Sequence, residues 1–164
     1  MQHNETKKAE ALIIVDDKGF AEDDLTDAFV NGHYGEITLA DLAIGLPANR
    51  PRTLGLILAV DSNIDAVLPY LQHLDVIKIP FASFSDGRGF SLAVELRRAG
   101  FAGRLRATGH VIVDQYAHAR RCGFDEVAIS TQQADRQPEH QWRAEVPKIN
   151  ETYQIRLHQA GRAA

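Results

Sequence analysis

Short apolar runs alternate with amphipathic stretches through the middle of the chain, and this alternation predicts a series of strand–helix units. The four runs that we expect to form strands are Leu54–Val60, Val76–Pro80, Arg104–Thr108 and Glu126–Ser130. The first run is uninterrupted, as is typical of a strand covered on both faces of its sheet. Between the runs, helical spacing of apolar residues predicts helices over residues 62–71, 89–99 and 111–122, the first capped by Asp61 or Ser62. The four strands are then parallel neighbours joined by right-handed crossovers.

A five-residue phrase occurs twice in this region, 23 residues apart, as Arg97-Arg98-Ala99-Gly100-Phe101 and Arg120-Arg121-Cys122-Gly123-Phe124. In each copy the glycine can take the left-handed conformation that ends a helix, and the phenylalanine can fold back as a hydrophobic cap. We therefore expect positive φ at Gly100 and Gly123. A regular spacing of 23 residues between strand–helix units is typical of an open three-layer α/β sheet and also of a partial (β/α) barrel. The sequence leaves the choice between these two folds open.

Less regular segments flank the repeated core, which spans about residues 54–130 of a single α/β domain at 11–164. Residues 1–10 are polar and predict a disordered leader. The runs Ala11–Val15 and Glu36–Ala40, separated by an acidic stretch, predict a short β-containing addition of hairpin or strand–loop type. Residues 139–146 predict a short helix. The alternation over 152–157 indicates an edge strand or a contact between two copies of the chain, so a homodimer is one expected assembly.

Length and composition set outer limits on the protein. Its 164 residues with 45% apolar content are enough for one domain with a full core. There is no apolar run of membrane-spanning length and no apolar leader, so we expect a cytoplasmic protein without a membrane partner. The single Cys122 excludes an intramolecular disulfide, and also a cysteine zinc site or iron–sulfur cluster within one chain. No haem or flavin motif is recognisable, and the sequence therefore identifies no cofactor.

Charge is distributed unevenly along the chain. Residues 1–49 carry ten acids and three bases, whereas residues 78–121 carry eight bases and three acids. Arginines in the repeated phrase can complement helix dipoles without any partner. We expect no nucleic-acid partner, because the pI is near 5.9 and the basic segment lacks clustered aromatic residues.

The loop from Phe81 to Gly89 is the first candidate site. Its Asp86-Gly87-Arg88-Gly89 stretch precedes a predicted helix, where backbone N–H groups and the helix dipole favour an anion and Arg88 can add a charge. It has neither the lysine of a Walker loop nor the third small residue of a dinucleotide fingerprint. The alternative is a structural turn with an exposed arginine.

A second candidate site lies on the strands themselves. Arg106 stands in the middle of an otherwise apolar strand, and Lys78 occupies a similar place on the preceding one. Two such cations could converge on a ligand near Gly109, His110 and Arg88. The alternative is an arginine that is paired with an acidic neighbour inside the protein.

His110 follows the third strand and is the residue best placed for acid–base chemistry, with Asp114 one turn later as a second catalytic candidate. Cys122 directly precedes a capping glycine, where a small packing residue is expected rather than a nucleophile. If the protein is an enzyme, we expect a lyase or isomerase in which His110 is the base and Arg88 and Arg106 are electrophiles.

Two motifs, DGRGFS at 86–91 and RCGFD at 121–125, resemble a bacterial family of unknown function. Genes of that family lie beside assimilatory sulfite reductase, and its members are often labelled as probable oxidoreductases of sulfite reduction. The family's pattern differs at Pro80 and His110, where it tends to have acidic residues. The resemblance implies functional roles at these positions: Asp86, Gly87, Arg88, Gly89, Ser91, Arg106, Gly109, Asp114, Gln115, Arg121 and Cys122.

Taken with the candidate sites, the resemblance implies an accessory protein of sulfur (sulfite) assimilation that binds a small oxyanion or an oxyanion-bearing metabolite. Its expected ligand-binding residues are Lys78, Asp86, Gly87, Arg88, Gly89, Ser91, Arg106 and Gly109. Two alternatives stay open, namely the enzyme with His110 as base and an interaction module for the sulfite reductase. In the second case the paired arginines of the repeated phrase would form the contact. The sequence does not decide whether the protein is an enzyme.

Overall fold

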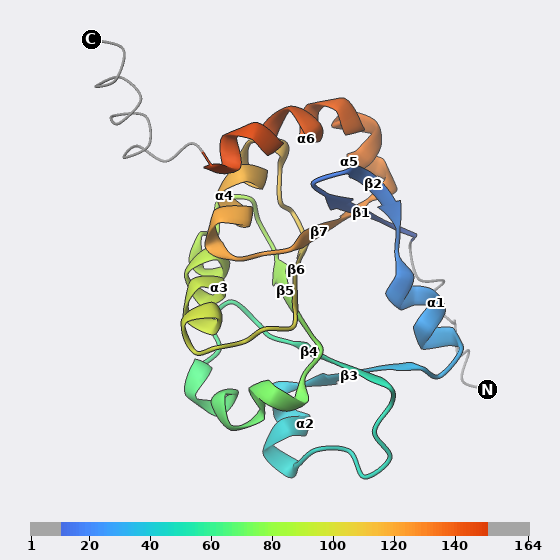
Figure 1. The fold of residues 1–164 in the computed structure, drawn as a ribbon, viewed down its shortest axis with the longest axis vertical. Helices are drawn as coiled ribbons and strands as arrows, with labels where there is room; N and C mark the ends of the chain where they lie inside the picture. Colours follow the sequence, from blue (N-terminus) through green and yellow to red (C-terminus); the bar gives the residue numbers. More distant parts are fainter. Residues whose placement is uncertain (1–10, 151–164) are drawn as a thin grey trace, which may run out of the picture.

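A computed structural model describes residues 11–150, and their strands form one open, mixed sheet of seven members in the order β2-β1-β7-β6-β5-β4-β3 (Figure 1). The strands are β1 (Leu12–Asp16), β2 (Gly19–Glu22), β3 (Tyr34–Thr38), β4 (Thr53–Ile57), β5 (Val76–Phe81), β6 (Arg104–Gly109) and β7 (Glu126–Ser130). Strands β3 to β7 are parallel, and β1 is antiparallel to both β7 and β2. The four predicted strands are therefore parallel neighbours, as expected, and the sheet does not close into a barrel.

Short helices connect the strands. The α-helices are α1 (Asp24–Val30), α2 (Leu39–Ile44), α3 (Arg88–Arg98), α4 (Tyr116–Cys122), α5 (Thr131–Arg136) and α6 (Glu139–Glu145). The 3₁₀ helices are η1 (Ile64–Ala66), η2 (Leu68–His73), η3 (Val113–Gln115) and η4 (Val146–Asn150). Helices α3, α4 and α6 lie along one side of the sheet, and α1 lies on the other (Figure 1). No helix within residues 11–150 is both long and apolar enough to cross a membrane.

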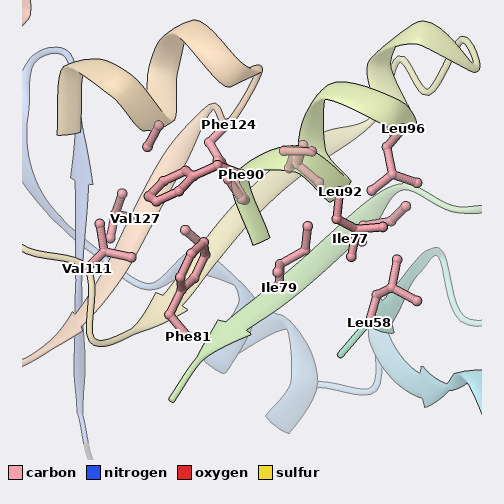
Figure 2. Close-up of a cluster of buried hydrophobic side chains, with 14 of the residues drawn as sticks. Leu58, Ile77, Ile79, Phe81, Phe90, Leu92, Leu96, Val111, Phe124 and Val127 are labelled. Carbon is pink, nitrogen blue, oxygen red and sulfur yellow. The ribbon is translucent and has the colours of Figure 1, made fainter. Parts of the chain in front are cut away.

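The main core lies between the sheet and the α3–α4 side (Figure 2). Alternate residues of β5 point into it, so Ile77, Ile79 and Phe81 are almost fully buried. The ring of Phe81 packs against those of Phe90 and Phe124, with centroids 5.0 and 6.0 Å away. Close packing of this kind fixes α3 and α4 over the sheet, and with them the loops that follow β5 and β6.

The opposite face of the sheet is only partly covered, which corrects the expectation that the first predicted strand is buried on both sides. Leu56 has no exposed surface, but the neighbouring Ile57 is 38% exposed. On β5, Pro80 is exposed and Lys78 is half-buried. The reason is the order of the strands: β3 to β7 follow one another along the chain, so their helical connections gather on one face.

Both copies of the repeated phrase end a helix in the same way. Gly100 has φ +93° and Gly123 has φ +108°, so both predictions of positive φ are confirmed. The first arginine of each phrase donates to the carbonyl of the phenylalanine, Arg97 to Phe101 and Arg120 to Phe124. Each copy of the repeat is therefore a helix stop in which the arginine satisfies a carbonyl group beyond the helix end, and Arg97 also donates to the carbonyl of Gly123 in the other copy.

Several local expectations were wrong. The predicted helix over 62–71 is a pair of 3₁₀ turns capped by Asn63, and Pro69, which lacks an N–H group, lies in the first turn of η2. The helix expected from residue 111 begins as η3 and becomes α-helical only at Tyr116. The N-terminal addition contains α1 and α2 as well as strands, whereas the helix at 139–146 is confirmed by α6. The predictions for residues 1–10 and 152–157 lie outside the described residues.

Candidate functional site

A pocket of about 250 Å³ lies where the carboxyl ends of β6 and β7 meet their following segments. Its lining residues are Phe84, His110, Ile112, Ser130, Gln132, Gln133, Arg136 and Gln137. Phe84 comes from the loop after β5, His110 directly follows β6, and Ser130 ends β7. The pocket therefore lies at the edge where parallel sheets commonly bind ligands.

Gly109 determines how His110 leaves β6. It has φ +90°, and a Cβ at this position would lie 2.6 Å from the carbonyl oxygen of Phe81. The next backbone N–H, that of His110, donates to this same oxygen at 3.0 Å. Only a glycine permits this close approach of β6 to the end of β5, so the predicted importance of Gly109 has a structural cause.

Glutamine side chains hold the segments around the pocket. Gln133 Nε2 donates to the Val111 carbonyl at 2.5 Å and to Gln137 Oε1 at 3.3 Å. The same Gln137 oxygen accepts from the Val113 N–H at 3.3 Å. Gln115 donates from Nε2 to the carbonyl of Phe84 at 2.6 Å, which ties the loop after β5 to η3. These hydrogen bonds join the segments that form the walls of the pocket.

The charged and titratable groups of the pocket favour an anion. Its lining contains the guanidinium of Arg136 and the imidazole of His110, and it contains no carboxylate. Both side chains belong to exposed residues. Within residues 11–150, Arg136 forms no ion pair with an acid. An arginine that is not neutralised inside the protein can donate two parallel hydrogen bonds to an oxyanion.

In the loop after β5, Asp86 occupies the place that was expected for a ligand anion. Its carboxylate accepts from the Arg88 backbone N–H at 3.2 Å and from the Arg88 guanidinium at 2.9 and 2.8 Å. These hydrogen bonds and the charge of Arg88 lower the pKa of Asp86 below its usual value. Arg88 and the start of α3 are therefore already partnered by an internal carboxylate.

The other residues of this loop have mainly local environments. Gly87 precedes α3 with an ordinary helical φ of −78°, and a Cβ on Gly89 would overlap the ring of Phe81. Arg88 and Ser91 line a separate shallow pocket of about 240 Å³. Asp61 and Glu95 line that pocket too, so it is less suited to an anion than the pocket at His110.

Arg106 lies on the less covered face of the sheet, beneath α1, and has no exposed surface. Its guanidinium donates to Glu126 at 2.6 Å, to Asp23 at 2.7 Å and to Asp24 at 3.3 Å. The expected convergence of Arg106 with Arg88 and His110 is therefore not formed, because three carboxylates already surround the side chain. The alternative interpretation, an arginine paired inside the protein, describes this geometry.

Lys78 stands opposite Arg106 in the register of β5 and β6 but has a partner of its own. Its Nζ lies 3.1 Å from Glu36 Oε2 and 5.1 Å from the centre of the Tyr34 ring. The side chain of Lys78 is 15% exposed. Like Arg106, this lysine links the parallel strands to the N-terminal part of the chain instead of facing the pocket at His110.

Asp114 and Cys122 also lie outside the lining of the pocket. Asp114 is exposed in η3. Cys122 Sγ is 3.6 Å from Nε2 of His118, a pair one helical turn apart that the sequence analysis did not identify. Burial raises the pKa of the Cys122 thiol and lowers the pKa of His118, so both groups are uncharged near neutral pH. An activated thiolate would require the opposite shifts.

The residues described contain no cluster of three His, Cys, Asp or Glu that could hold a metal ion.

The sequence analysis missed most of the pocket. The residues that it did not single out as ligand candidates are Phe84, Ile112, Ser130, Gln132, Gln133, Arg136 and Gln137. A signal was available in the position of Ser130, which ends a predicted strand and caps α5 by accepting from the Gln133 N–H at 3.1 Å. Ligand sites gather at the carboxyl ends of parallel strands, so the segment after Ser130 has the same claim to a site as the loop after β5. A larger pocket, about 430 Å³, lies at the other end of the strands and is lined by no ionisable side chain.

Comparison with protein-family models matches residues 55–162 to DUF934, described as a bacterial protein of unknown function. The match covers about two thirds of the chain and includes every residue that lines the pocket at His110. It leaves out the hairpin of β1 and β2, α1, β3 and α2. No curated protein matches the chain.

Proposed function

The chain belongs to the DUF934 family of bacterial proteins of unknown function, and we propose that it is an accessory protein of sulfur (sulfite) assimilation that binds a small oxyanion or an oxyanion-bearing metabolite. The binding site in this proposal is the pocket at the carboxyl ends of β6 and β7. Arg136 and His110 bind the anion there, in place of the Arg88 and Arg106 that the sequence suggested.

The observation that carries the proposal is the charge of the lining, with Arg136 and His110 present and carboxylates absent. A hydrogen bond to a charged group contributes about 1.5–3 kcal/mol. Loss of the Arg136 contact should then weaken binding by roughly one to two orders of magnitude. His110 can donate from its ring in either protonation state, and its positive charge adds to the attraction when the ring is protonated.

The link to sulfur rests on the resemblance carried by the motifs at 86–91 and 121–125. In the structure, these motifs support the pocket from outside. Gly89 packs against the ring of Phe81, Gly123 ends α4, and Phe124 is buried in the core. The proposal therefore assigns the motifs to the framework and the chemistry to residues 110 and 130–137.

Calorimetric titration with sulfite, sulfate and phosphate tests the proposal. We expect saturable binding by the unaltered protein, with a loss of roughly tenfold or more for Arg136→Ala and a smaller loss for His110→Ala. Arg143→Ala is a matched control, because Arg143 is exposed on α6 and does not line the pocket. The proposal fails if no anion binds at millimolar concentration, or if Arg143→Ala weakens binding as much as Arg136→Ala does.

The structure bears differently on the two alternatives. If the protein is an enzyme, the exposed His110 at the wall of the pocket is the candidate base. A catalytic activity that is lost in His110→Ala would favour this alternative. For an interaction module, the paired arginines were expected to form the contact. Three of these four arginines already donate hydrogen bonds within the protein: Arg97, Arg120 and Arg121. We therefore favour the anion-binding proposal.

A further inference from the structure

We propose that the oxyanion bound in this pocket is carried on an aromatic ring, as in an aryl or nucleoside monoester of phosphate or sulfate, and that Phe84 is the surface on which the ring stacks. This inference rests on the proposed function, because it extends the ligand of the same pocket. It assigns a chemical class to the group attached to the anion.

Phe84 is unusual for its exposure. Within residues 11–150, the exposed large apolar residues are Phe29, Val30, Ile44, Ile57, Leu68 and Phe84. Phe84 is the member of this set that lines the pocket at His110, and its relative exposure is 58%. Ile112, which is half-buried, adds a second apolar residue to the same lining. The pocket thus combines an apolar wall with the guanidinium of Arg136 and the imidazole of His110.

The loop that presents Phe84 is organised by hydrogen bonds within the protein. The Gln115 side chain donates to the Phe84 carbonyl at 2.6 Å. On either side of the phenylalanine, the hydroxyls of Ser83 and Ser85 lie 2.8 Å apart, and the Ser85 N–H donates to the Ser83 hydroxyl at 3.2 Å. Because the backbone is already held in place, little ordering entropy opposes stacking on this ring.

The size of the pocket also exceeds what a free anion needs. A pocket of about 250 Å³ approaches the range of about 300–1,000 Å³ that is typical of sites for small organic ligands. Sulfate and phosphate have only five non-hydrogen atoms. A bare oxyanion would therefore leave part of the pocket unfilled, next to an apolar wall, where a planar ring gains both burial and stacking.

Calorimetric titration with four probes separates this inference from the function on which it rests. The probes are inorganic phosphate, methyl phosphate, cyclohexyl phosphate and phenyl phosphate. We expect phenyl phosphate to bind about 3–10-fold more tightly than methyl phosphate, and more tightly than cyclohexyl phosphate, because stacking adds to apolar burial. In Phe84→Ala the advantage of the phenyl group should disappear while binding of inorganic phosphate stays the same. In Phe84→Leu, phenyl phosphate should keep only the gain in affinity over methyl phosphate that cyclohexyl phosphate also shows.

The outcomes have distinct meanings. If inorganic phosphate and all three esters fail to bind, the proposed function itself is wrong. If inorganic phosphate binds but phenyl phosphate gains nothing over methyl phosphate, or if Phe84→Ala keeps the gain, the anion site stands and the aromatic inference is overturned. Because Phe84 is exposed, we expect both variants to have the same melting temperature as the unaltered protein. A loss of binding can then not be attributed to unfolding.

Discussion

Asp23 and Arg106 are joined by an ion pair of 2.7 Å, and this pair attaches the start of α1 to the middle of β6. The exposed fraction of the Arg106 side chain is 0%, and that of Asp23 is 7%. Asp23 also caps α1 by accepting from the Leu25 N–H at 3.1 Å. One carboxylate therefore begins the helix and neutralises a buried cation, which explains how the strand tolerates a mid-strand arginine.

Replacing Arg106 should affect stability much more than replacing Arg88. Arg106→Leu leaves the Asp23 carboxylate without its cation and leaves Glu126 with only Arg104, at 3.5 Å, so we expect the unfolding free energy to fall by about 3–5 kcal/mol. Arg88→Ala removes a solvent-exposed local pair and should change the unfolding free energy little, because water screens the two charges. Urea denaturation of both variants measures the difference. Similar losses in the two would contradict the assignment of Arg106 to the framework.

Stability should decline in acid as the carboxylates beneath α1 become protonated. Burial opposes ionisation of Asp23, but hydrogen bonds and the charge of Arg106 outweigh it and lower the pKa of Asp23. Hydrogen bonds from Arg104 likewise lower the pKa of Asp24. A carboxyl group whose pKa is lowered in the folded state stabilises the protein at pH values above its pKa in the unfolded chain, about 3.9. This stabilisation is lost as the pH falls through the lowered pKa of the folded state.

Thermal melts between pH 7 and pH 2 test this expectation. The melting temperature of the unaltered protein should be steady near neutral pH and fall below about pH 4. Asp23→Asn keeps an N-cap acceptor but has no charge to lose. Its melting temperature should therefore be lower than that of the unaltered protein at neutral pH, and it should change less as the pH falls. An equal acid dependence in both proteins would count against this ion pair as a source of stability.

The repeated phrase made the central sheet predictable, because glycine and phenylalanine at fixed spacing mark where each helix ends. The N-terminal part was harder to predict. Thr38 and Asp41 form a capping box that starts α2, and a capping box is visible in sequence, but α2 has only six residues and no clear apolar period. The partners of Arg106 could not be predicted, because Asp23 lies 83 positions away and no local pattern joins the two.

The two capping glycines should differ in their tolerance of alanine. At Gly100 a Cβ would meet nothing within 4 Å, so only its φ of +93° opposes substitution, at about 1 kcal/mol. At Gly123 a Cβ would lie 2.5 Å from Cγ of Arg97, whose guanidinium is held by backbone carbonyls, and we expect a loss of about 2 kcal/mol. Gly87→Ala, at a helical φ in open space, is the control and should be neutral. Equal melting temperatures for all three variants would contradict the capping argument.

Cys122 should react slowly with thiol reagents. Burial raises the pKa of its thiol, and the uncharged His118 beside it does not stabilise a thiolate. At pH 7.5, modification by a chromogenic disulfide should be slower than that of a small free thiol, and its rate should still rise above about pH 8.5. Unfolding in guanidinium should restore the ordinary rate. A native thiol that reacts faster than the free one would reopen a nucleophilic role.

The pocket was only partly predictable from sequence because its residues belong to three separate segments. His110 could be identified, since it directly follows a strand that the pattern made clear. Arg136 could not, because the polar segment after Ser130 has no apolar periodicity that would predict a helix at the sheet edge. The glutamine contacts depend on side-chain geometry that carries no periodic signal. The sequence thus predicted a candidate site at this edge of the sheet, and the pocket in the structure provides a different set of candidate residues there.

Backbone amide chemical shifts, followed by NMR during titration with phosphate, test the central claim most directly because they locate the bound anion. We predict saturable shifts at His110, Gln133 and Arg136, and no saturable shift at Asp23 or Arg106. Saturable shifts confined to residues 86–91, or none at millimolar phosphate, would contradict the assignment of anion binding to the pocket at the carboxyl ends of β6 and β7.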